Sequence, residues 1–225
     1  MLWNINPLVA HWISSTSNFL FTDQLLRSDS IVLELGAGIS PLIGLCLSPY
    51  IGRYLWTDQD YVLKTLRQNV EMNARSSTAK STKLKQQPRK SHGKEQPVYE
   101  RSCIDVVALD WETSDVRSIL GVTSRAPSVL IGVDCVFNPA IIKPFVSTLA
   151  EMSTLVEDDQ GPVLTIVAQQ LRSPDVFSEW LEVMLERFRV WRICKEALTL
   201  GAQAEDTKMT VEQGYTVHVC ILKDT

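Results

Sequence analysis

The sequence predicts an α/β fold, in which a mostly parallel sheet is covered by helices on both faces and ends in an antiparallel hairpin. Three observations support this prediction. Short apolar runs alternate with segments of helical periodicity along most of the 225 residues. The first run, Ile31 to Leu35, leads into the glycine turn Gly36-Ala37-Gly38 and a helix-like segment, the corner that begins a nucleotide-binding sheet. The last two runs, 190–193 and 215–221, are expected to pair with each other.

Each expected element has a local reason. The first helix has Asn6-Pro7 near its start, where proline suits the first turn, and the helix after the second strand has Val62, Leu66 and Val70 as a buried stripe. The fifth strand is almost continuously apolar, as expected for a strand covered on both faces. Strands are expected at 31–35, 53–57, 106–109, 129–133, 163–169, 190–193 and 215–221. Helices are expected at 1–28, 40–48, 59–73, 139–154 and 174–187, with a short turn or helix at 115–120. This succession of elements indicates a Rossmann-like, seven-stranded fold.

Length and composition indicate one ordinary globular domain over residues 1–225. The net charge of −4 gives no general affinity for nucleic acid or anionic membranes, and no apolar run is long enough to span a membrane. The five cysteines are scattered without a Cys-x-x-Cys pair, which indicates reduced thiols in a cytoplasmic or nuclear protein. The three histidines lie far apart, so no metal site is expected.

Residues 74–97 differ in composition from the rest of the chain. They contain seven Lys and Arg residues against one acid, so their net charge is about +6 and that of the remaining chain about −10. With Leu84 as the one aliphatic residue beyond alanine, the segment cannot bury enough surface to order itself. We expect a disordered insertion, which is either a solvated loop or a weak contact for RNA or an acidic partner.

The glycine turn leaves three interpretations open. A dinucleotide fingerprint, Gly-x-Gly-x-x-Gly, is incomplete because Pro41 stands at the third glycine position. Glu34 precedes the first glycine, and Glu-x-Gly-x-Gly after a first strand is typical of S-adenosylmethionine sites. The acid suits that cofactor's cationic sulfonium and ammonium groups. The third interpretation is a turn with a purely structural role.

The other strand ends supply further candidates, because the carboxyl ends of parallel strands form one rim of the sheet. Asp58, with Gln59 beside it, lies 22 positions after Gly36 and suits the two hydroxyls of a ribose. Trp111 offers a stackable wall for adenine, with Asp110 near its exocyclic amine. Asp134 would lie near the methyl group and its acceptor. The structural alternatives are helix-capping acids at Asp58 and Asp134 and a core tryptophan at Trp111.

Methyl transfer from a sulfonium requires an aligned nucleophile in a dry site more than it requires acid–base catalysis. A lysine nucleophile must also lose its proton, which an apolar channel favours and a nearby carboxylate opposes. Asp134 could orient the amine while Phe137 forms the channel wall. The sequence Asn138-Pro139-Ala140 lacks the second proline and the aromatic residue of a nucleic-acid amino-methyltransferase motif.

The chain resembles the seven-β-strand protein-lysine methyltransferases with an Asp-x-x-Tyr/Phe motif, and most closely their fungal ribosomal lysine methyltransferase 5 group. The matching pieces are Leu2-Trp3, Leu33 to Ser40, Thr57-Asp58-Gln59, Ala108 to Glu112, Asp134-Cys135-Val136-Phe137 and Leu171-Arg172-Ser173. The resemblance implies cofactor contacts at Trp3, Glu34, Gly36, Gly38, Asp58 and Trp111, with Asp134 and Phe137 at the acceptor lysine. It also implies tyrosine as the commoner residue at position 137 and an additional N-terminal segment in the relatives.

The sequence therefore predicts an S-adenosylmethionine-dependent methyltransferase that acts on a lysine of a protein, with a ribosomal or translation-related protein as the expected substrate. A small-molecule or nucleic-acid methyltransferase and a non-catalytic interaction module remain as alternatives. We expect a monomer without membrane attachment, in the cytoplasm or nucleus.

Overall fold

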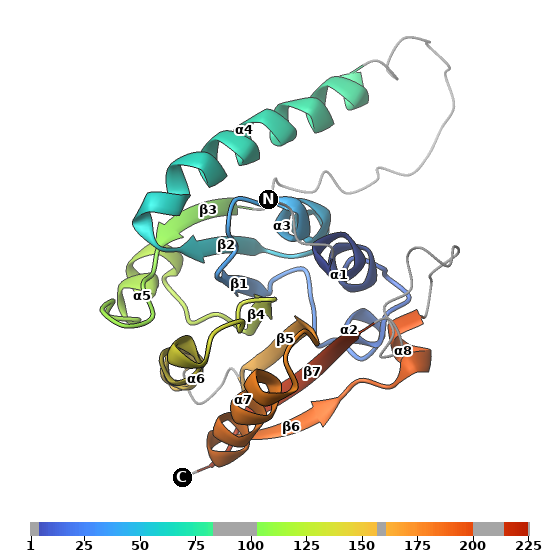
Figure 1. Ribbon diagram of the computed structural model, residues 1–225. Helices are drawn as coiled ribbons and strands as arrows, with labels where there is room; N and C mark the ends of the chain where they lie inside the picture. Colours follow the sequence, from blue (N-terminus) through green and yellow to red (C-terminus); the bar gives the residue numbers. More distant parts are fainter. Residues whose placement is uncertain (1–4, 83–102, 157–160, 200–213, 225) are drawn as a thin grey trace.

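A seven-stranded sheet forms the centre of the molecule, in the order β3-β2-β1-β4-β5-β7-β6 (Figure 1). The computed structural model describes residues 5–82, 103–156, 161–199 and 214–224. The strands are β1 (Ile31–Leu35), β2 (Arg53–Asp58), β3 (Cys103–Ala108), β4 (Val129–Val133), β5 (Leu164–Gln170), β6 (Phe188–Arg192) and β7 (Tyr215–Leu222). The Rossmann-like plan expected from the sequence is confirmed.

The first five strands are parallel, and β7 runs antiparallel to both of its neighbours, β5 and β6. The register places Leu35 beside Thr57 of β2 and Gly132 of β4, so these strands end at nearly the same level. From β1 the chain continues to β2 and β3 on one side, whereas β4 and β5 lie on the other side. Such a reversal of strand order opens a crevice at the carboxyl edge of the sheet, where ligands bind in folds of this type.

Helices cover both faces of the sheet. One face packs against α1 (Ile5–Ile13), α3 (Leu42–Leu47) and α4 (Asp60–Thr82), with the fully buried Tyr54 and Trp56 in this half of the core. The other face packs against α5 (Ser118–Thr123), α6 (Ile142–Ser153) and α7 (Pro174–Arg187), with Phe145 and Trp180 buried there. Short 3₁₀ turns, η1 (Ser48–Tyr50) and η2 (Pro139–Ile141), follow α3 and precede α6. The strands are therefore apolar on both sides, as the apolar sequence of β5 (Leu164–Gln170) predicted.

The expected N-terminal helix over residues 1–28 was wrong beyond Ile13. Helix α1 ends there, and a separate turn, α2 (Phe19–Thr22), begins after Asn18. The Asn18 side chain accepts a hydrogen bond from the Leu20 amide at 3.1 Å and donates one to the Trp12 carbonyl at 2.9 Å. The intervening residues 14–17 are three serines and a threonine, whose side chains compete for backbone hydrogen bonds and favour turns.

Two further differences concern the ends of elements. Helix α4 continues to Thr82, nine residues into the expected insertion, and the rest of that insertion up to residue 97 lies outside the described residues. A short helix, α8 (Lys195–Thr199), follows β6 where no helix is expected. The polar connection expected at 201–213 lies outside the described residues. None of the described helices combines the length and apolar character needed to cross a lipid bilayer.

Candidate functional site

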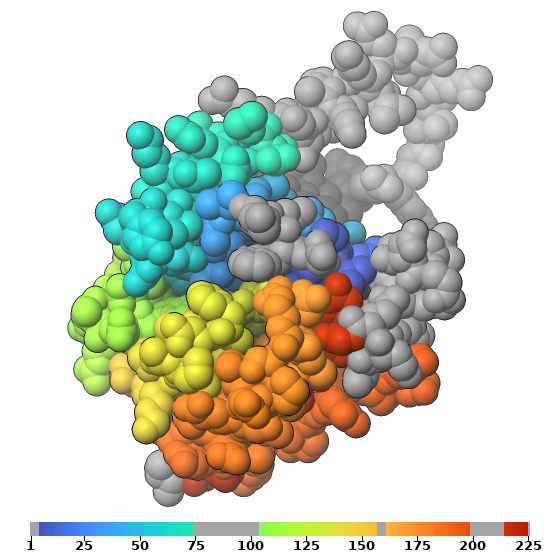
Figure 2. Space-filling view, viewed as in Figure 1, coloured from blue at the N-terminus to red at the C-terminus, as the bar shows by residue number. Residues whose placement is uncertain are grey.

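A cavity of about 250 Å³ opens at the carboxyl edge of the sheet, where the order of the strands reverses. Its walls come from the ends of β1 to β4, the start of α4 and the segment before α6. These segments adjoin on one face of the molecule in the space-filling view, in cyan, green and yellow (Figure 2). The lining residues are Gly36, Gly38, Asp58, Gln59, Tyr61, Leu109, Asp110, Trp111, Glu112, Val133, Asp134, Cys135, Phe137, Ile141 and Pro144.

The glycine turn forms the floor of this cavity beside the Trp111 indole. Gly36 and Gly38 have φ angles of +66° and +61°, in the left-handed region that favours glycine. A Cβ atom on Gly36 would lie 3.0 Å from the Trp111 ring and 3.1 Å from Cys135 Sγ, whereas none of the described atoms lies within 4 Å of a Cβ on Gly38. Gly36 is therefore required both by its backbone conformation and by the close approach of Trp111.

Asp58 is held in place by two backbone amides. Its Oδ2 accepts a hydrogen bond from Gly38 N at 2.7 Å, and its Oδ1 accepts one from Gln59 N at 2.8 Å. Each carboxylate oxygen has two lone pairs, so each oxygen keeps one lone pair for another donor. This arrangement suits a vicinal diol, whose two hydroxyl groups would each donate to one oxygen.

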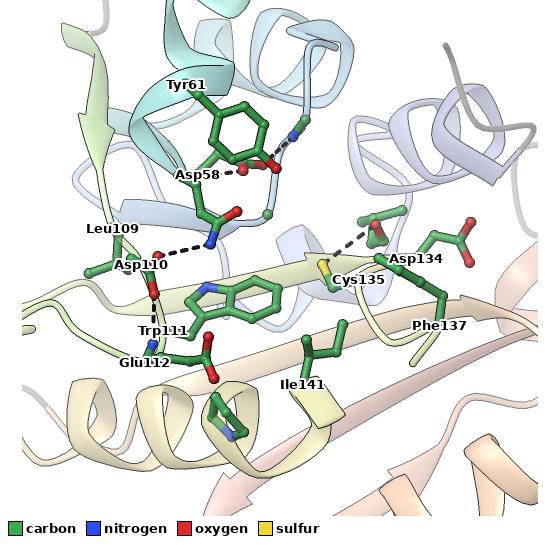
Figure 3. Close-up of a pocket in the computed structure, with 15 residues that line it drawn as sticks. Asp58, Tyr61, Leu109, Asp110, Trp111, Glu112, Asp134, Cys135, Phe137 and Ile141 are labelled. Atoms are coloured by element: carbon green, nitrogen blue, oxygen red, sulfur yellow. Dashed lines mark hydrogen bonds between the residues drawn. The ribbon is translucent and has the colours of Figure 1, made fainter. Parts of the chain in front are cut away.

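The next wall consists of Asp110 and Trp111, which follow β3. Gln59 Nε2 donates to Asp110 Oδ2 at 2.8 Å, and the Glu112 amide donates to Asp110 Oδ1 at 2.9 Å (Figure 3). These hydrogen bonds, that of Glu112 foremost, hold the pKa of Asp110 below its ordinary value. Behind the cavity the Trp111 ring packs against Phe145 of α6, with ring centroids 5.1 Å apart. The indole is thus fixed with one face toward the cavity.

Glu34 lies behind the cavity and is absent from its lining. It is 2% exposed, and Tyr54 donates its hydroxyl to Glu34 Oε2 at 2.7 Å. Burial raises the pKa of Glu34 to about 8, an effect that the Tyr54 hydrogen bond reduces and the charge of Asp58 increases. The carboxyl group therefore holds a proton over most of the neutral range, which the sequence did not indicate.

Asp134 has an unusual backbone and an ionic partner. Its φ angle is +56°, which is rare for a residue with a side chain. Its carboxylate forms two hydrogen bonds with the Arg172 guanidinium, Nη1 to Oδ1 at 3.1 Å and Nη2 to Oδ2 at 2.6 Å. Figure 3 shows this carboxylate pointing away from the Trp111 indole.

Phe137 separates this cavity from a smaller neighbouring one and lines both. The second cavity has a volume of about 70 Å³ and lies between the segment after β4 and the start of α7. Phe137 is 67% exposed, which is unusual for a large aromatic side chain. The second cavity is lined by Val136, Phe137, Gln169, Gln170, Leu171, Arg172, Ser173, Val176 and Phe177.

The larger cavity is acidic. Among the described residues that line it are four carboxylates, Asp58, Asp110, Glu112 and Asp134, and no Lys, Arg or His. Such a wall attracts cations. In the described part of the chain, no group of three or more His, Cys, Asp or Glu side chains is arranged to hold a metal ion.

The cavity brings together most of the residues that the sequence predicted. Gly36, Gly38, Asp58, Gln59, Asp110, Trp111, Asp134 and Phe137 all line it, Glu34 lies behind it, and Trp3 lies outside the described residues. Sequence reasoning assigned no role to Tyr61 or Arg172. Tyr61 stands three positions after Asp58 in the first turn of α4, and Arg172 follows the strand next to β4. Their positions just after strands that end at the same rim were the signal in the sequence that could have identified them.

Comparisons with known proteins agree with this geometry. Residues 1–98 match the family model described as lysine methyltransferase. The ribosomal lysine N-methyltransferase 5 of Candida glabrata is 28% identical over 225 aligned positions, which cover 84% of this chain and 64% of that protein. The chain is related to the lysine methyltransferases. The family resemblance expected from the motifs is thus confirmed.

Two other similarities qualify this relationship. A Schizosaccharomyces pombe protein named diaminohydroxyphosphoribosylamino-pyrimidine deaminase is 26% identical over 209 positions, which cover 93% of this chain but 43% of that protein. The chain thus spans less than two thirds of the length of each of these two relatives. The solved structure of the mitomycin 7-O-methyltransferase MmcR superposes with a TM-score of 0.55 at 9% identity, covering 97% of this chain and 54% of that one. At this identity the similarity concerns the fold alone.

Proposed function

We propose that this protein is an S-adenosylmethionine-dependent methyltransferase that methylates a lysine side chain of a protein. One observation supports this most strongly: the family match coincides with an acidic cavity whose Asp58, Gly36 and Trp111 suit an adenosine. We further propose a ribosomal or translation-related protein as the substrate, as in the names of the fungal relatives.

The cavity residues fit the parts of the cofactor. Asp58 would accept the ribose hydroxyls with its two remaining lone pairs, and Trp111 would stack on the adenine while Asp110 and Gln59 border it. Gly36 and Gly38 would let the backbone approach the methionine part. The cationic sulfonium and ammonium groups would lie among carboxylates, with no basic lining residue to repel them.

When bound, the cofactor supplies an electrophilic methyl group, so the residues of the chain have to align and deprotonate the acceptor. The acceptor amine would need an unprotonated lone pair that is held in line with the methyl group by the residues around it. Phe137, between the two cavities, would shield this step from water, and Asp134 would orient the amine.

The acidic cavity and the net charge of −4 favour a basic protein segment as substrate. We propose that the chain acts as a monomer in the cytoplasm or nucleus, and that the basic segment at 74–97 makes at most a weak contact with RNA. Phe137 lacks the hydroxyl of the commoner tyrosine, so the rate and number of methyl additions depend on a site without that hydrogen bond.

The first test is titration calorimetry with S-adenosylhomocysteine on the wild type, Asp58→Ala and Glu71→Ala. Glu71 is exposed on α4 and absent from the cavity lining, so it serves as a matched control for the loss of an acid. Loss of hydrogen bonds to a charged group is worth about 1.5–3 kcal/mol, so Asp58→Ala should bind about 10- to 100-fold more weakly. Glu71→Ala should bind like the wild type.

Incubation with extract and radiolabelled cofactor then identifies the acceptor class. The expected outcome is label in protein, which hydrolysis of that protein releases as methyl-lysine. Label in RNA or in metabolites with none in protein would replace this proposal with the nucleic-acid or small-molecule alternative. Absence of cofactor binding by the wild type would favour a non-catalytic interaction module.

A further inference from the structure

The Asp134–Arg172 ion pair lies at the junction of the two cavities. Asp134 lines the larger cavity, Arg172 lines the smaller one, and Phe137 lines both. The two short hydrogen bonds, at 3.1 and 2.6 Å, form the bidentate geometry in which arginine binds a carboxylate most strongly. An acceptor side chain that passes Phe137 between the cavities therefore meets this pair.

Asp134 and Arg172 differ in burial, and Asp134 can still accept a further hydrogen bond. The Asp134 side chain is 2% exposed, whereas that of Arg172 is 40% exposed. The Asp134 carboxylate accepts two bonds from Arg172 and a weaker one from Gln170 N at 3.3 Å to Oδ1. A carboxylate offers about four lone pairs, so one acceptor position remains, on Oδ2. Asp134 can thus accept one more N–H group while its charge stays balanced.

A free carboxylate at this place would hinder the proposed reaction. A negative charge within about 4–6 Å of an amine stabilises the ammonium and raises its pKa by about 1–3 units. The ammonium has no lone pair and cannot attack a methyl group. The other carboxylates of the larger cavity act in the same direction, so the pairing of Asp134 with Arg172 removes one of several charges that would keep the acceptor protonated.

We propose that Arg172 is a positioning residue that neutralises Asp134, so that the acceptor lysine reaches the methyl donor as an uncharged amine. This inference rests on the proposed methyltransferase function. It assigns to Arg172 no contact with the reacting atoms: the guanidinium acts through Asp134, which keeps one lone pair to orient the amine.

A neighbouring group supports this assignment. Gln169 lines the smaller cavity, is 4% exposed, and its Oε1 has no hydrogen-bond partner among the described residues. An uncharged amine could donate to this carbonyl, which satisfies the amide without adding a negative charge. Among the described residues, the other ionisable side chains of the larger cavity are Asp58 at the end of β2, Tyr61 of α4, Asp110 and Glu112 after β3 and Cys135 after β4, whereas the smaller cavity has none besides Arg172.

The test compares pH–rate profiles of methyl transfer for the wild type, Arg172→Lys, Arg172→Gln and the double variant Asp134→Asn/Arg172→Gln. Arg172→Gln should shift the rise in rate upward by about one pH unit or more, which is about a tenfold loss near pH 7 that recovers at high pH. Arg172→Lys keeps the charge and should keep the wild-type profile. The double variant should return toward that profile, because the unpaired carboxylate is gone.

An equal loss at every pH in Arg172→Gln, or the same shift in Arg172→Lys, would overturn the inference. Arg189→Gln removes an exposed ion pair with Asp224 outside both cavities and should leave the profile unchanged.

Thermal unfolding provides a readout that needs no activity, so it separates this inference from the proposed function. Arg172→Gln leaves a buried carboxylate without its partner and should lower the Tm by about 5 °C or more at pH 7.5. Asp134→Asn/Arg172→Gln should recover most of that loss. Equal Tm losses in the single and double variants would show that Arg172 does not compensate Asp134, whether or not methyl transfer is detected.

Discussion

Replacing Glu34 by glutamine should remove a pH dependence of stability without disturbing the packing. Glu34 is buried, and its pKa of about 8 in the folded protein lies above the ordinary value of 4.5. The folded state therefore binds the proton more tightly than the unfolded state. The stability that this group contributes is complete below pH 4.5 and is lost as the pH rises through 8. Glutamine has nearly the same shape, stays neutral and can still accept the Tyr54 hydroxyl.

The difference between the wild type and the Glu34→Gln variant isolates this effect over the interval from pH 6.5 to 7.5. Burial, together with the charge of Arg192, lowers the pKa of His218 to about 4, so unfolding lets this histidine take up protons near its ordinary pKa of 6.5. That contribution opposes the one from Glu34, but it is the same in both proteins and cancels in the comparison. The unfolded Glu34 is ionised there, while the folded one is mostly protonated. One pH unit then changes the free energy of unfolding by about 1 kcal/mol. For a chain of this size that corresponds to a Tm change of about 2–4 °C.

The assay is thermal unfolding of wild type and Glu34→Gln, without cofactor, in a phosphate buffer at pH 6.5, 7.0 and 7.5. Across the interval the wild-type Tm should fall by about 2–4 °C relative to the Tm of the variant. At pH 7.5 the variant should be the more stable protein. An equal fall in both proteins would refute the reasoning, because Glu34 would then ionise in the folded state as it does in the unfolded chain.

Two further predictions concern the walls of the larger cavity. Gly36→Ala should lower the Tm by more than Gly38→Ala, because both variants carry the left-handed backbone cost of about 1–2 kcal/mol but Gly36→Ala also meets the Trp111 ring at 3.0 Å. Equal Tm losses would exclude that contact. Trp111→Ala should weaken S-adenosylhomocysteine binding about 10-fold or more, since stacking on a base is worth about 1–3 kcal/mol, and Trp111→Phe should lose less. Calorimetry that finds unchanged binding in both variants would place the adenine elsewhere.

The sheet and the rim of the cavity could be predicted because both depend on local patterns. Apolar runs of β1 to β5 mark strands that are buried on both faces, and the acids that follow them must meet at one edge of a parallel sheet. Asp58, Asp110 and Trp111 were found in this way. The prediction of one N-terminal helix was wrong because apolar residues recur at helical spacing on both sides of residues 14–17. Between them lies a serine-rich turn, and hydrogen bonds of this turn end the helix.

The roles of Glu34 and Arg172 could not be predicted in this way, because they depend on contacts between distant strands. The sequence places Glu34 on a strand end next to the glycine turn, but only the fold brings the Tyr54 hydroxyl to its carboxyl group behind the cavity. Likewise, 38 positions separate Asp134 from Arg172, and the parallel pairing of β4 with β5 brings them together. Pairings of this kind follow from strand order, which a single sequence does not specify.

Cys135 places a thiol in the wall of the larger cavity, at the carboxyl edge of the sheet. Its Sγ donates to the Leu35 carbonyl at 3.0 Å, across the reversal point between β1 and β4, and the residue is 6% exposed. Burial raises the pKa of this thiol well above its ordinary value, so it should react slowly with alkylating reagents that enter the larger cavity. Cys194 is exposed and needs no such entry. A ligand that fills the larger cavity should therefore lower the alkylation rate of Cys135 relative to that of Cys194, which gives a chemical readout of the occupancy of the site.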